Sequence, residues 1–437
     1  MADETSRKPF RVIIAGGSIA GLTLANALER ANIDYVLLEK REVAPNIGQS
    51  LLVLPCTSLV LEQLGIADLL KQIAIPIHTR EHYDGNGKLF CSSDELWQLY
   101  KKSQRPMRFV DRYRFLFSLI DGIKDKTKVH SHEGVVSFTE TEDGVTVRTD
   151  QGNIYEGSIL VGADGVHSEV RKQIAALTEN PKRHKILTNG FVTRYACLTA
   201  VSNNWFIDEP ERRFLDDGII TNSYHDKEKV GALSAVGTAG QLIWTCYIPV
   251  EHTEYPSPRY TQDDVEATIK KFGHVRPHPN YSLSDIYKNK IGATLIAMEE
   301  NVLPTDWHSG QRVVLIGDSV HKATANLGMG GNLCIDDVCR LVNGLDPLLK
   351  QNPTPSTQEL VKVFDEYQRE AKPRALFVNR ASAFFCGFET QTAWYATIFK
   401  WIFPWIPSSI KMKVFSDFDA AAPSIKYLTI PEAKYEG

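Results

Sequence analysis

The stretch between residues 312 and 332 constrains the fold more than any other part of this 437-residue chain. An apolar run typical of a buried strand ends at the turn Gly317-Asp318, and a glycine-rich loop then leads into a helix predicted over 333–348. Glycines let backbone N–H groups approach a planar or anionic ligand, and the N-terminus of a helix carries partial positive charge. The stretch therefore predicts a strand–loop–helix unit that holds such a ligand.

A second glycine-rich turn lies near the N-terminus, between a predicted strand and a predicted helix. Gly16 would permit the tight turn, and Gly21 would let the helix pack closely on the strand, so that the helix N-terminus faces a pyrophosphate. Glu39 ends the next strand and would accept hydrogen bonds from a ribose whose 2′-hydroxyl is free, as in FAD or NAD. The alternative is a purely structural turn. The candidate cofactor-binding residues here are Gly16, Gly17, Ser18, Gly21 and Glu39; Ser18 replaces the middle glycine of the usual pattern.

A third motif lies in the middle of the chain, where an apolar run over 159–162 leads into Ala163-Asp164-Gly165 and then a predicted helix. Asp-Gly and Gly-Asp pairs are common turns and carry no information singly. Here each motif follows an apolar strand and precedes a helix. Three such motifs in this order are far more specific than any single turn. Together they indicate a flavin enzyme.

Composition excludes several other classes of protein. The chain is 43% hydrophobic and 23% charged, which is ordinary for a soluble globular protein, and its net charge is −4 with no basic block typical of nucleic-acid binding. The polar N-terminus does not resemble a signal peptide. Seven cysteines without a C-x-x-C pair, together with scattered histidines, predict reduced thiols in an intracellular, cytoplasmic protein and no metal site.

The order of the predicted elements indicates a mixed α/β fold. Helices are predicted over 57–70, 111–120 and 357–385, and a β meander over 128–162. The ligand motifs lie toward the two ends of the chain and the β-rich material lies between them. We therefore expect a Rossmann-like FAD-binding domain built from discontinuous segments, an inserted β-rich substrate domain, and a C-terminal helical tail. The expected boundaries are 1–75, 105–178 and 302–350 for the first, 76–104 and 179–301 for the second, and 351–437 for the tail.

With these motifs the chain resembles the single-component, group A FAD-dependent monooxygenases of the aromatic-hydroxylase type, over roughly residues 10–383. The resemblance implies FAD as cofactor, NADPH or NADH as reductant, and O2 as co-substrate, with oxygen transfer through a C4a-hydroperoxyflavin. It also implies that Glu39 binds ribose, that Arg112 steadies the pyrophosphate, and that Asp318 holds the ribityl chain. The further cofactor-binding residues that it implies are Lys40, Gly48, Val53, Asp164, Gly328, Gly330, Gly331 and Asn332.

Within that group the N-terminal motif and the aromatic C-terminal tail resemble fungal paxilline-type monooxygenases. This resemblance implies a small apolar substrate, namely a prenylated indole, an indole diterpene or a meroterpenoid, that is epoxidised or hydroxylated. Two alternatives stay open. One is a phenol- or salicylate-type hydroxylase, and the other is a flavin-binding protein without catalytic activity.

Two residues of the predicted substrate domain are catalytic candidates. Arg194 lies on its first predicted strand, within an otherwise apolar run, where a guanidinium could hydrogen-bond the substrate; the alternative is a salt-bridged surface arginine. Tyr195 alternates to the other face of that strand, so only one of the two should point inward. Tyr224 is the nearest match to the tyrosine that the family carries in this domain, and the alternative is a core aromatic.

The segment 394–407 is rich in tryptophan, tyrosine and isoleucine. It is too short to span a bilayer and is interrupted by Lys400 and Pro404. Tryptophan at this density favours a boundary between apolar and aqueous surroundings. Two interpretations remain, a helix packed on the body of the protein and a peripheral membrane contact.

Overall fold

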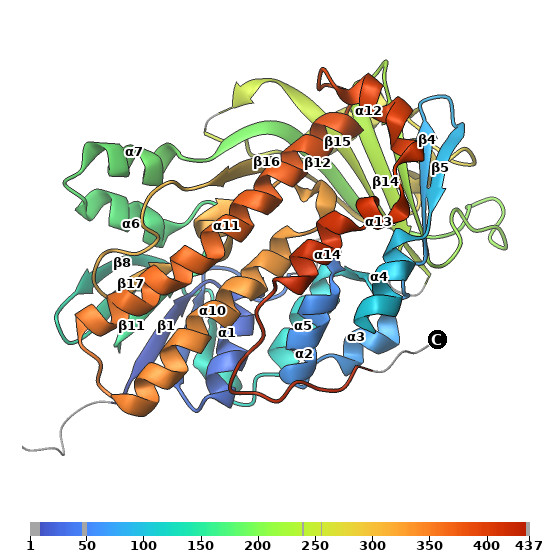
Figure 1. Ribbon diagram of the computed structural model, residues 1–437. Coiled ribbons are helices and arrows are strands. Elements are labelled where there is room, and N and C mark those ends of the chain that lie inside the picture. The colour runs from blue at the N-terminus through green and yellow to red at the C-terminus, as the bar shows by residue number, and fades with distance from the viewer. Residues whose placement is uncertain (1–8, 46–49, 238–239, 255, 434–437) are drawn as a thin grey trace, which may run out of the picture.

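The computed structural model describes residues 9–45, 50–237, 240–254 and 256–433. The chain forms a mixed α/β structure with two large sheets, one parallel and one mostly antiparallel, and long helices that run across both (Figure 1). The predicted fold class is confirmed. Among the described residues, no helix is both long and apolar enough to cross a bilayer.

The five-stranded parallel sheet carries the three glycine motifs. Its strands are fully apolar in their centres because both faces are covered, one by helices and the other by the β meander of residues 135–157. Val12, Ile14 and Val161 are completely buried. Helices α1 (Ile19–Arg30) and α10 (Gly330–Gln351) pack against one another beside it. In spatial order the strands are β17 (Val313–Leu315), β11 (Ile159–Gly162), β1 (Arg11–Ala15), β2 (Asp34–Glu39) and β7 (Val129–Ser131).

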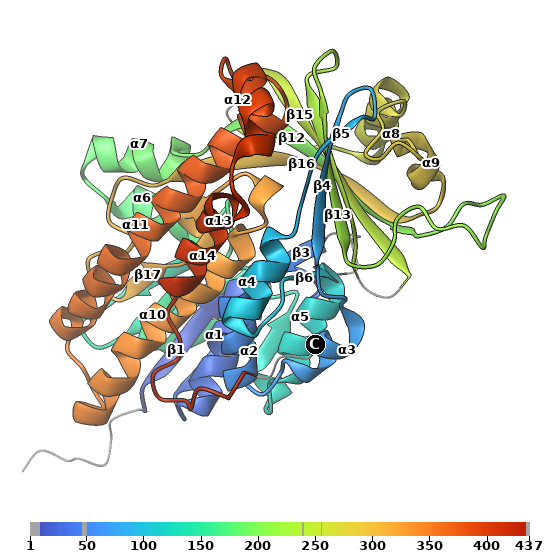
Figure 2. The ribbon, with the colours of Figure 1, turned by 45° about the vertical axis from the view of Figure 1, so that its right-hand side comes forward.

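The eight-stranded sheet contains most of the β-rich central region. One of its faces packs on α8 and α9 around Trp244, and the other faces α10 and α11 (Figure 2). Two strands from the first hundred residues complete its edge. In spatial order the strands are β18 (His321–Lys322), β16 (Lys290–Val302), β12 (Val192–Asn203), β15 (Gln241–Glu254), β14 (Val230–Val236), β13 (Ile219–His225), β4 (Thr79–Asp84) and β5 (Leu89–Ser93).

Two small sheets complete the β structure. One is a three-stranded meander, and the other is a two-stranded pair that contributes Leu52 and Phe109 to the apolar cluster between the large sheet and the glycine loop. The strands of the meander are β8 (Val135–Glu140), β9 (Val145–Thr149) and β10 (Ile154–Gly157), and those of the pair are β3 (Ser50–Val53) and β6 (Arg108–Asp111).

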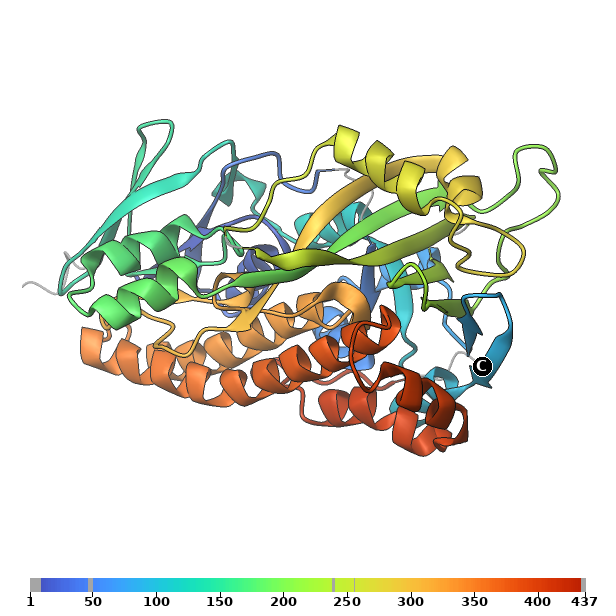
Figure 3. The same cartoon turned by 90° about the horizontal axis from the view of Figure 1, so that it is seen from above.

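Helix α11 (Thr357–Glu389) connects the two halves of the molecule. Its first part packs on the core of the parallel sheet through Leu360 and Phe364, and its last part contributes Val378 and Cys386 to the cluster beneath the eight-stranded sheet. Seen from above, α11 lies alongside α10 (Gly330–Gln351) on one side of the long strands (Figure 3).

The remaining helices cover the edges and faces of the sheets. They are α1 (Ile19–Arg30), α2 (Pro55–Gln63), α3 (Asp68–Ile73), α4 (Glu95–Ser103), α5 (Arg112–Asp121), α6 (Glu169–Leu177), α7 (Pro181–Asn189), α8 (Gln262–Phe272), α9 (Leu283–Lys288), α12 (Ala396–Ile402), α13 (Ser408–Lys411) and α14 (Lys413–Ala420), with 3₁₀ turns η2 (Lys126–Lys128), η3 (Gly317–Ser319), η4 (Ala325–Leu327) and η5 (Phe403–Trp405).

Two predicted helices differ from the structure. The helix expected over 57–70 is two helices, α2 and α3, because Gly65 between them adopts a left-handed conformation with φ +69°. The helix expected to open at Leu333 begins three residues earlier, at Gly330, so that the glycines form its first turn. The seven cysteines are free and buried.

Candidate cofactor site

The three glycine motifs converge at one edge of the parallel sheet. β11 pairs with β1 on one side and with β17 on the other, so the turns that follow these strands all lie at their carboxyl ends. A Cβ atom built on Gly16 would lie 2.4 Å from the carbonyl oxygen of Ala163, and one on Gly317 would lie 3.5 Å from the Cβ of Ala20. The carboxyl edge of a parallel sheet is the usual ligand-binding edge in open α/β folds.

Two glycines of the first turn are required by geometry. Gly16 has φ +111°, which L side chains rarely adopt, and it lies against the backbone of the second motif. A Cβ on Gly21 would lie 1.8 Å from the carbonyl oxygen of Gly16. Any side chain at these two positions would push α1 away from β1 and displace the helix N-terminus.

The N-terminus of α1 is open toward the site. Ser18 stands at its N-cap without making a side-chain cap, and the first turn contains no acidic residue. The Ser18 hydroxyl instead accepts a hydrogen bond of 2.7 Å from Nη2 of Arg112. Burial lowers the pKa of the Arg112 guanidinium, an effect that the charge of Asp318 opposes. Free N–H groups beside a buried guanidinium fit a diphosphate.

Glu39 lies at the end of β2, next to the first turn. Its Oε2 accepts a 2.7 Å hydrogen bond from the N–H of Gly17, and its Oε1 accepts one of 2.9 Å from the N–H of Arg41. The carboxylate therefore holds the glycine turn in place, a role that the motif alone did not predict. Its contact with ribose stays a prediction.

We expect Glu39→Ala to weaken FAD binding by about 1–3 kcal/mol, because the variant loses the ribose acceptor and the anchor of the Gly17 N–H. The matched control is Glu42→Ala, since Glu42 lies nearby in an exposed pair with His132. The flavin that remains after dialysis measures the effect. Equal retention by the two variants would contradict the assignment of Glu39.

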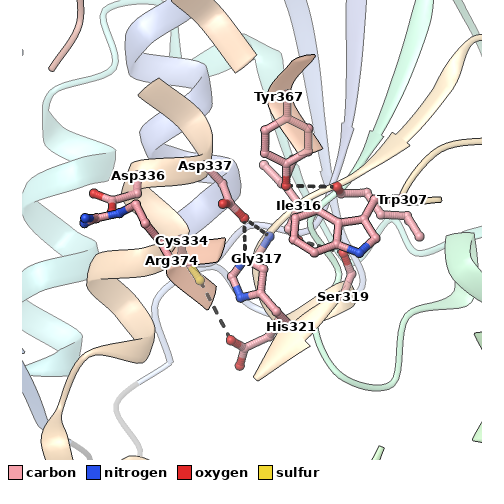
Figure 4. A network of polar contacts seen from close by, with 12 residues as sticks. Trp307, Ile316, Gly317, Ser319, His321, Cys334, Asp336, Asp337, Tyr367 and Arg374 are labelled. Atoms are coloured by element: carbon pink, nitrogen blue, oxygen red, sulfur yellow. Dashed lines mark hydrogen bonds and ion pairs between the residues drawn. The ribbon is translucent and has the colours of Figure 1, made fainter. Parts of the chain in front are cut away.

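A buried polar network fastens the third turn from beneath (Figure 4). Oδ2 of Asp337, on α10, accepts hydrogen bonds of 2.7 Å from the N–H of Gly317 and of 2.7 Å from Nε2 of His321. Burial alone would lower the pKa of His321, but the Asp337 carboxylate raises it above its ordinary value. His321 is therefore a packing and ion-pairing residue.

Asp318 itself is 37% exposed and lies outside that network. The Cys334 thiol donates to its Oδ1 at 3.8 Å, and Nζ of Lys322 lies 4.0 Å from its Oδ2. Lys322 also pairs with the buried Glu299 at 2.8 Å. Burial would lower the pKa of Lys322, but Asp318 and Glu299 raise it. The Asp318 carboxylate thus retains capacity to accept further hydrogen bonds.

The glycine loop closes against β3. A Cβ on Gly328 would lie 2.7 Å from the Cβ of Leu52, and one on Gly331 would lie 2.5 Å from Cδ1 of Leu51. Gly330 has open space around it, and α10 begins there with no side-chain cap and no acidic residue in its first turn. This helix N-terminus offers backbone N–H groups to an anionic ring edge.

The side chain of Asn332, which is predicted to be a cofactor-binding residue, is engaged by other protein groups. Its Oδ1 accepts hydrogen bonds from the Leu54 N–H and the Thr57 hydroxyl, and its Nδ2 donates to the carbonyls of Leu52 and Gly328. The amide is fully engaged in joining α10 to β3, because a buried amide requires partners for all its groups. The Asn332 side chain therefore shapes the site, and a contact of this residue with the cofactor stays a prediction.

The other predicted cofactor residues lie around the same edge. Oδ2 of Asp164 caps α6 by accepting from the N–H groups of Glu169 and Val170, whereas its Oδ1 is buried and has no hydrogen-bond partner among the described residues. Val53 is buried in β3, and Lys40 is exposed just after β2. Gly48 lies outside the described residues. The unpartnered oxygen of Asp164 fits a ligand that supplies a donor.

The face of the eight-stranded sheet above the glycine loop is apolar. Leu327 and Met329 of the loop belong to one cluster with Cys197, Ile243 and Met298 of the sheet. Within the described part of the chain, no group of His, Cys, Asp and Glu side chains could hold a metal ion. The arrangement can exclude water from a ligand held at the N-terminus of α10.

Arg194 lies at a β-bulge, and of Arg194 and Tyr195 it is Tyr195 that points inward. The register of β12 against β15 shifts between Thr193 and Tyr195. The Arg194 side chain is 54% exposed and its Nη1 lies 2.7 Å from Oε1 of the buried Glu300, whereas Tyr195 packs on the inner cluster. The ion pair matches the structural alternative, and a role toward substrate stays a prediction. Bulges are common next to active sites, where they redirect a side chain.

Tyr224 lies in a buried aromatic cluster away from the glycine loop. It is 1% exposed, its hydroxyl lies 2.7 Å from Nδ1 of His82, and its ring packs on Phe388. Burial raises the pKa of its hydroxyl well above the ordinary value. These contacts match the alternative of a core aromatic, because the hydroxyl is already paired inside the core, and a role of Tyr224 toward substrate stays a prediction.

The FAD binding domain family matches this chain over residues 10–382. The chain belongs to this family. It is similar to the FAD-dependent monooxygenase ausM of Penicillium brasilianum, with 30% identity over 99% of this chain and 90% of that protein. It is also similar to the FAD-dependent monooxygenase spyC of Aspergillus fumigatus, with 34% identity over 86% of this chain and 79% of that protein. The predicted family of FAD-dependent monooxygenases is confirmed.

Solved structures share the fold. Klebsiella pneumoniae HpxO, solved in a complex with FAD and uric acid, superposes with a TM-score of 0.71 and 17% identity over 95% of this chain and 97% of that one. CtdE, solved with FAD and a substrate, gives a TM-score of 0.67 and 17% identity over 98% and 95%. All three glycine turns lie within the residues that the FAD binding domain family matches.

Proposed function

We propose that this FAD-dependent monooxygenase uses NADPH or NADH and O2 to epoxidise or hydroxylate a bulky apolar secondary metabolite inside the cell. The observation that carries the proposal is the convergence of three glycine turns and two open helix N-termini, those of α1 and α10, beneath an apolar sheet face. The substrate class, namely prenylated indoles, indole diterpenes or meroterpenoids, rests on the sequence resemblance and on that apolar lining.

A bound flavin would supply the redox and oxygen-transfer chemistry. The N-terminus of α1 with Arg112 would hold the diphosphate, and Asp318 would hold the ribityl hydroxyls. The N-terminus of α10 at Gly330 would stabilise negative charge on the reduced ring through fixed backbone dipoles. The cluster around Met298 and Met329 would exclude water and orient an apolar substrate.

The test is incubation of the purified, FAD-loaded protein with NADPH, O2 and either a prenylated indole or a simple phenol, followed by mass spectrometry. We expect a one-oxygen gain on the prenylated indole. A gain on the phenol alone would assign the chain to the phenol hydroxylases. Flavin reduction without oxygen transfer to any substrate tried would favour the non-catalytic flavin-binding alternative.

Arg194 is proposed as a substrate-side residue, and its ion pair with Glu300 makes a double-variant test possible. Arg194→Ala should leave flavin content unchanged and reduce product formation by about 10–100-fold, the effect of one lost charge-assisted hydrogen bond. It also leaves a buried carboxylate unpaired, so the melting temperature should fall.

The variant Arg194→Ala combined with Glu300→Gln separates the two effects, because it removes the unpaired charge. We expect this pair of changes to restore the melting temperature but not the rate of product formation. Recovery of both would make Arg194 a structural residue.

A further inference from the structure

Helix α12 and the turn η5 are apolar on two opposite faces. Ala396, Phe399 and Phe403 form the inner face and pack on the end of α11 and on the buried aromatic cluster around Phe388. A helix that is apolar all round is normally buried on all sides. Here only the inner side is covered by the rest of the protein. Packing on the body of the protein therefore explains the apolar residues of the inner face but not those of the outer face.

The other face is exposed to an unusual degree. Trp394, Trp401 and Trp405 are 88%, 77% and 81% exposed, and Ile398 and Ile402 between them are 58% and 43% exposed. Their spacing of four, three, one and three residues places them along one side of a helix. We call these five residues the tryptophan stripe. Single exposed apolar residues are normal, but a contiguous set of this size marks an interaction surface.

The exposed apolar surface continues onto α11. Phe377 and Phe384 are 40% and 39% exposed, and Arg380 lies between them at helical spacing and is also exposed. The Phe384 ring stacks on Tyr395 at 4.5 Å, which joins this surface to the start of α12. The stripe and the end of α11 thus form one surface with a cationic side chain inside it.

The charged residues around the tryptophan stripe indicate which kind of partner it could bind. Residues 390–416 contain three lysines and no aspartate or glutamate. Lys400 and Lys413 pair with Asp226 and Asp417, which lie outside that segment. Lys411 contacts the Cys91 thiol, so the exposed positive charge within this surface is that of Arg380. Exposed tryptophans beside such a cation are complementary to anionic headgroups over an apolar layer.

We propose that the tryptophan stripe binds the surface of a bilayer that contains anionic phospholipid, with α12 lying in the interfacial plane. The proposal does not depend on which substrate the enzyme oxidises. The turn that precedes α12 also reaches the inner side of the large sheet, where the hydroxyls of Thr392 and Tyr195 are 3.3 Å apart, next to Arg194. A docked protein would therefore hold this end of the sheet close to the lipid.

The experiment is flotation of the full-length, FAD-loaded protein with vesicles of phosphatidylcholine, with and without phosphatidylserine. We expect the protein to float with the mixed vesicles and its tryptophan fluorescence to be quenched by brominated lipid. The variant that combines Trp394→Ser, Trp401→Ser and Trp405→Ser should bind at least about tenfold more weakly, since three large apolar side chains no longer enter the lipid.

The matched control is Trp205→Ser, because Trp205 is 39% exposed in the loop that follows β12. It should bind vesicles as the unchanged protein does, and both variants should keep their flavin. Absence of flotation with either vesicle, or equal binding by the triple variant, would overturn the proposal. A dimer in solution that the triple variant converts to a monomer, without lipid binding, would assign the stripe to a second copy of the chain and would equally overturn it.

Discussion

Replacing Asp318 by alanine is expected to give a protein that is purified almost without flavin. The carboxylate lies in the third glycine turn and is partly exposed. Its nearest polar contacts among the described residues are long, to the Cys334 thiol at 3.8 Å and the Lys322 ammonium at 4.0 Å. Hydrogen bonds to a charged acceptor contribute about 1.5–3 kcal/mol each, so loss of two such bonds to the ribityl hydroxyls would weaken binding by about two orders of magnitude or more.

The absorbance of flavin relative to protein after gel filtration measures this effect. The matched control is Asp306→Ala, since Asp306 is an exposed residue of the loop that precedes β17. This control should keep its flavin. A yellow Asp318→Ala protein with unchanged flavin content would show that the carboxylate does not hold the cofactor.

Replacing Asp337 by alanine is expected to cause the largest loss of stability. The change would leave His321 buried without its counter-charge and the Gly317 N–H without an acceptor. Removal of one partner from a buried ion pair typically costs about 3–5 kcal/mol. Glu366→Ala is the control, because Glu366 pairs with Arg369 on the exposed surface of α11, and exposed pairs contribute about 0–1 kcal/mol.

The His321–Asp337 pair also predicts a dependence on pH. The pKa of His321 is raised in the folded protein, so the pair stabilises the fold fully below the unfolded pKa of about 6.5. This contribution is lost as the pH rises through the folded pKa. The melting temperature of the unchanged protein should exceed that of Asp337→Asn, and this difference should become smaller as the pH rises. An advantage that grows with pH would show that His321 is neutral in the fold.

Local sequence was sufficient to predict the three strand–turn units that lie together at one edge of the parallel sheet. Gly16, Gly21 and Glu39 belong to one local unit of strand, turn, helix and next strand. Their spacing therefore predicts their positions around the turn without knowledge of the rest of the fold. The three motifs could be assigned to one ligand because parallel strands place their carboxyl ends on one edge of the sheet.

Long-range contacts account for what the sequence could not reveal. The amide of Asn332 is engaged by β3, nearly three hundred residues away, so its spacing within the glycine loop suggested a different role. The sequence left open whether Arg194 or Tyr195 points inward, and the register shift before Tyr195 could not be foreseen. A bulge depends on two partner strands, and no periodicity within one strand reports it.

The burial of Tyr224 also results from long-range contacts. Its cluster combines His82 of β4, Phe388 of α11 and Phe403 of η5, which come from three distant parts of the chain. The network under the third turn could have been suspected from the sequence, since His321 and Asp337 flank the glycine loop. Only the fold shows that one carboxylate oxygen serves both the histidine and the turn.

A crystal structure of the protein with FAD tests the central claim most directly. We predict a single FAD whose ribose lies by Glu39, whose diphosphate lies at the N-terminus of α1 beside Arg112, and whose ring lies at the N-terminus of α10. FAD bound elsewhere, or a protein that takes up no FAD at saturating concentration, would contradict the account.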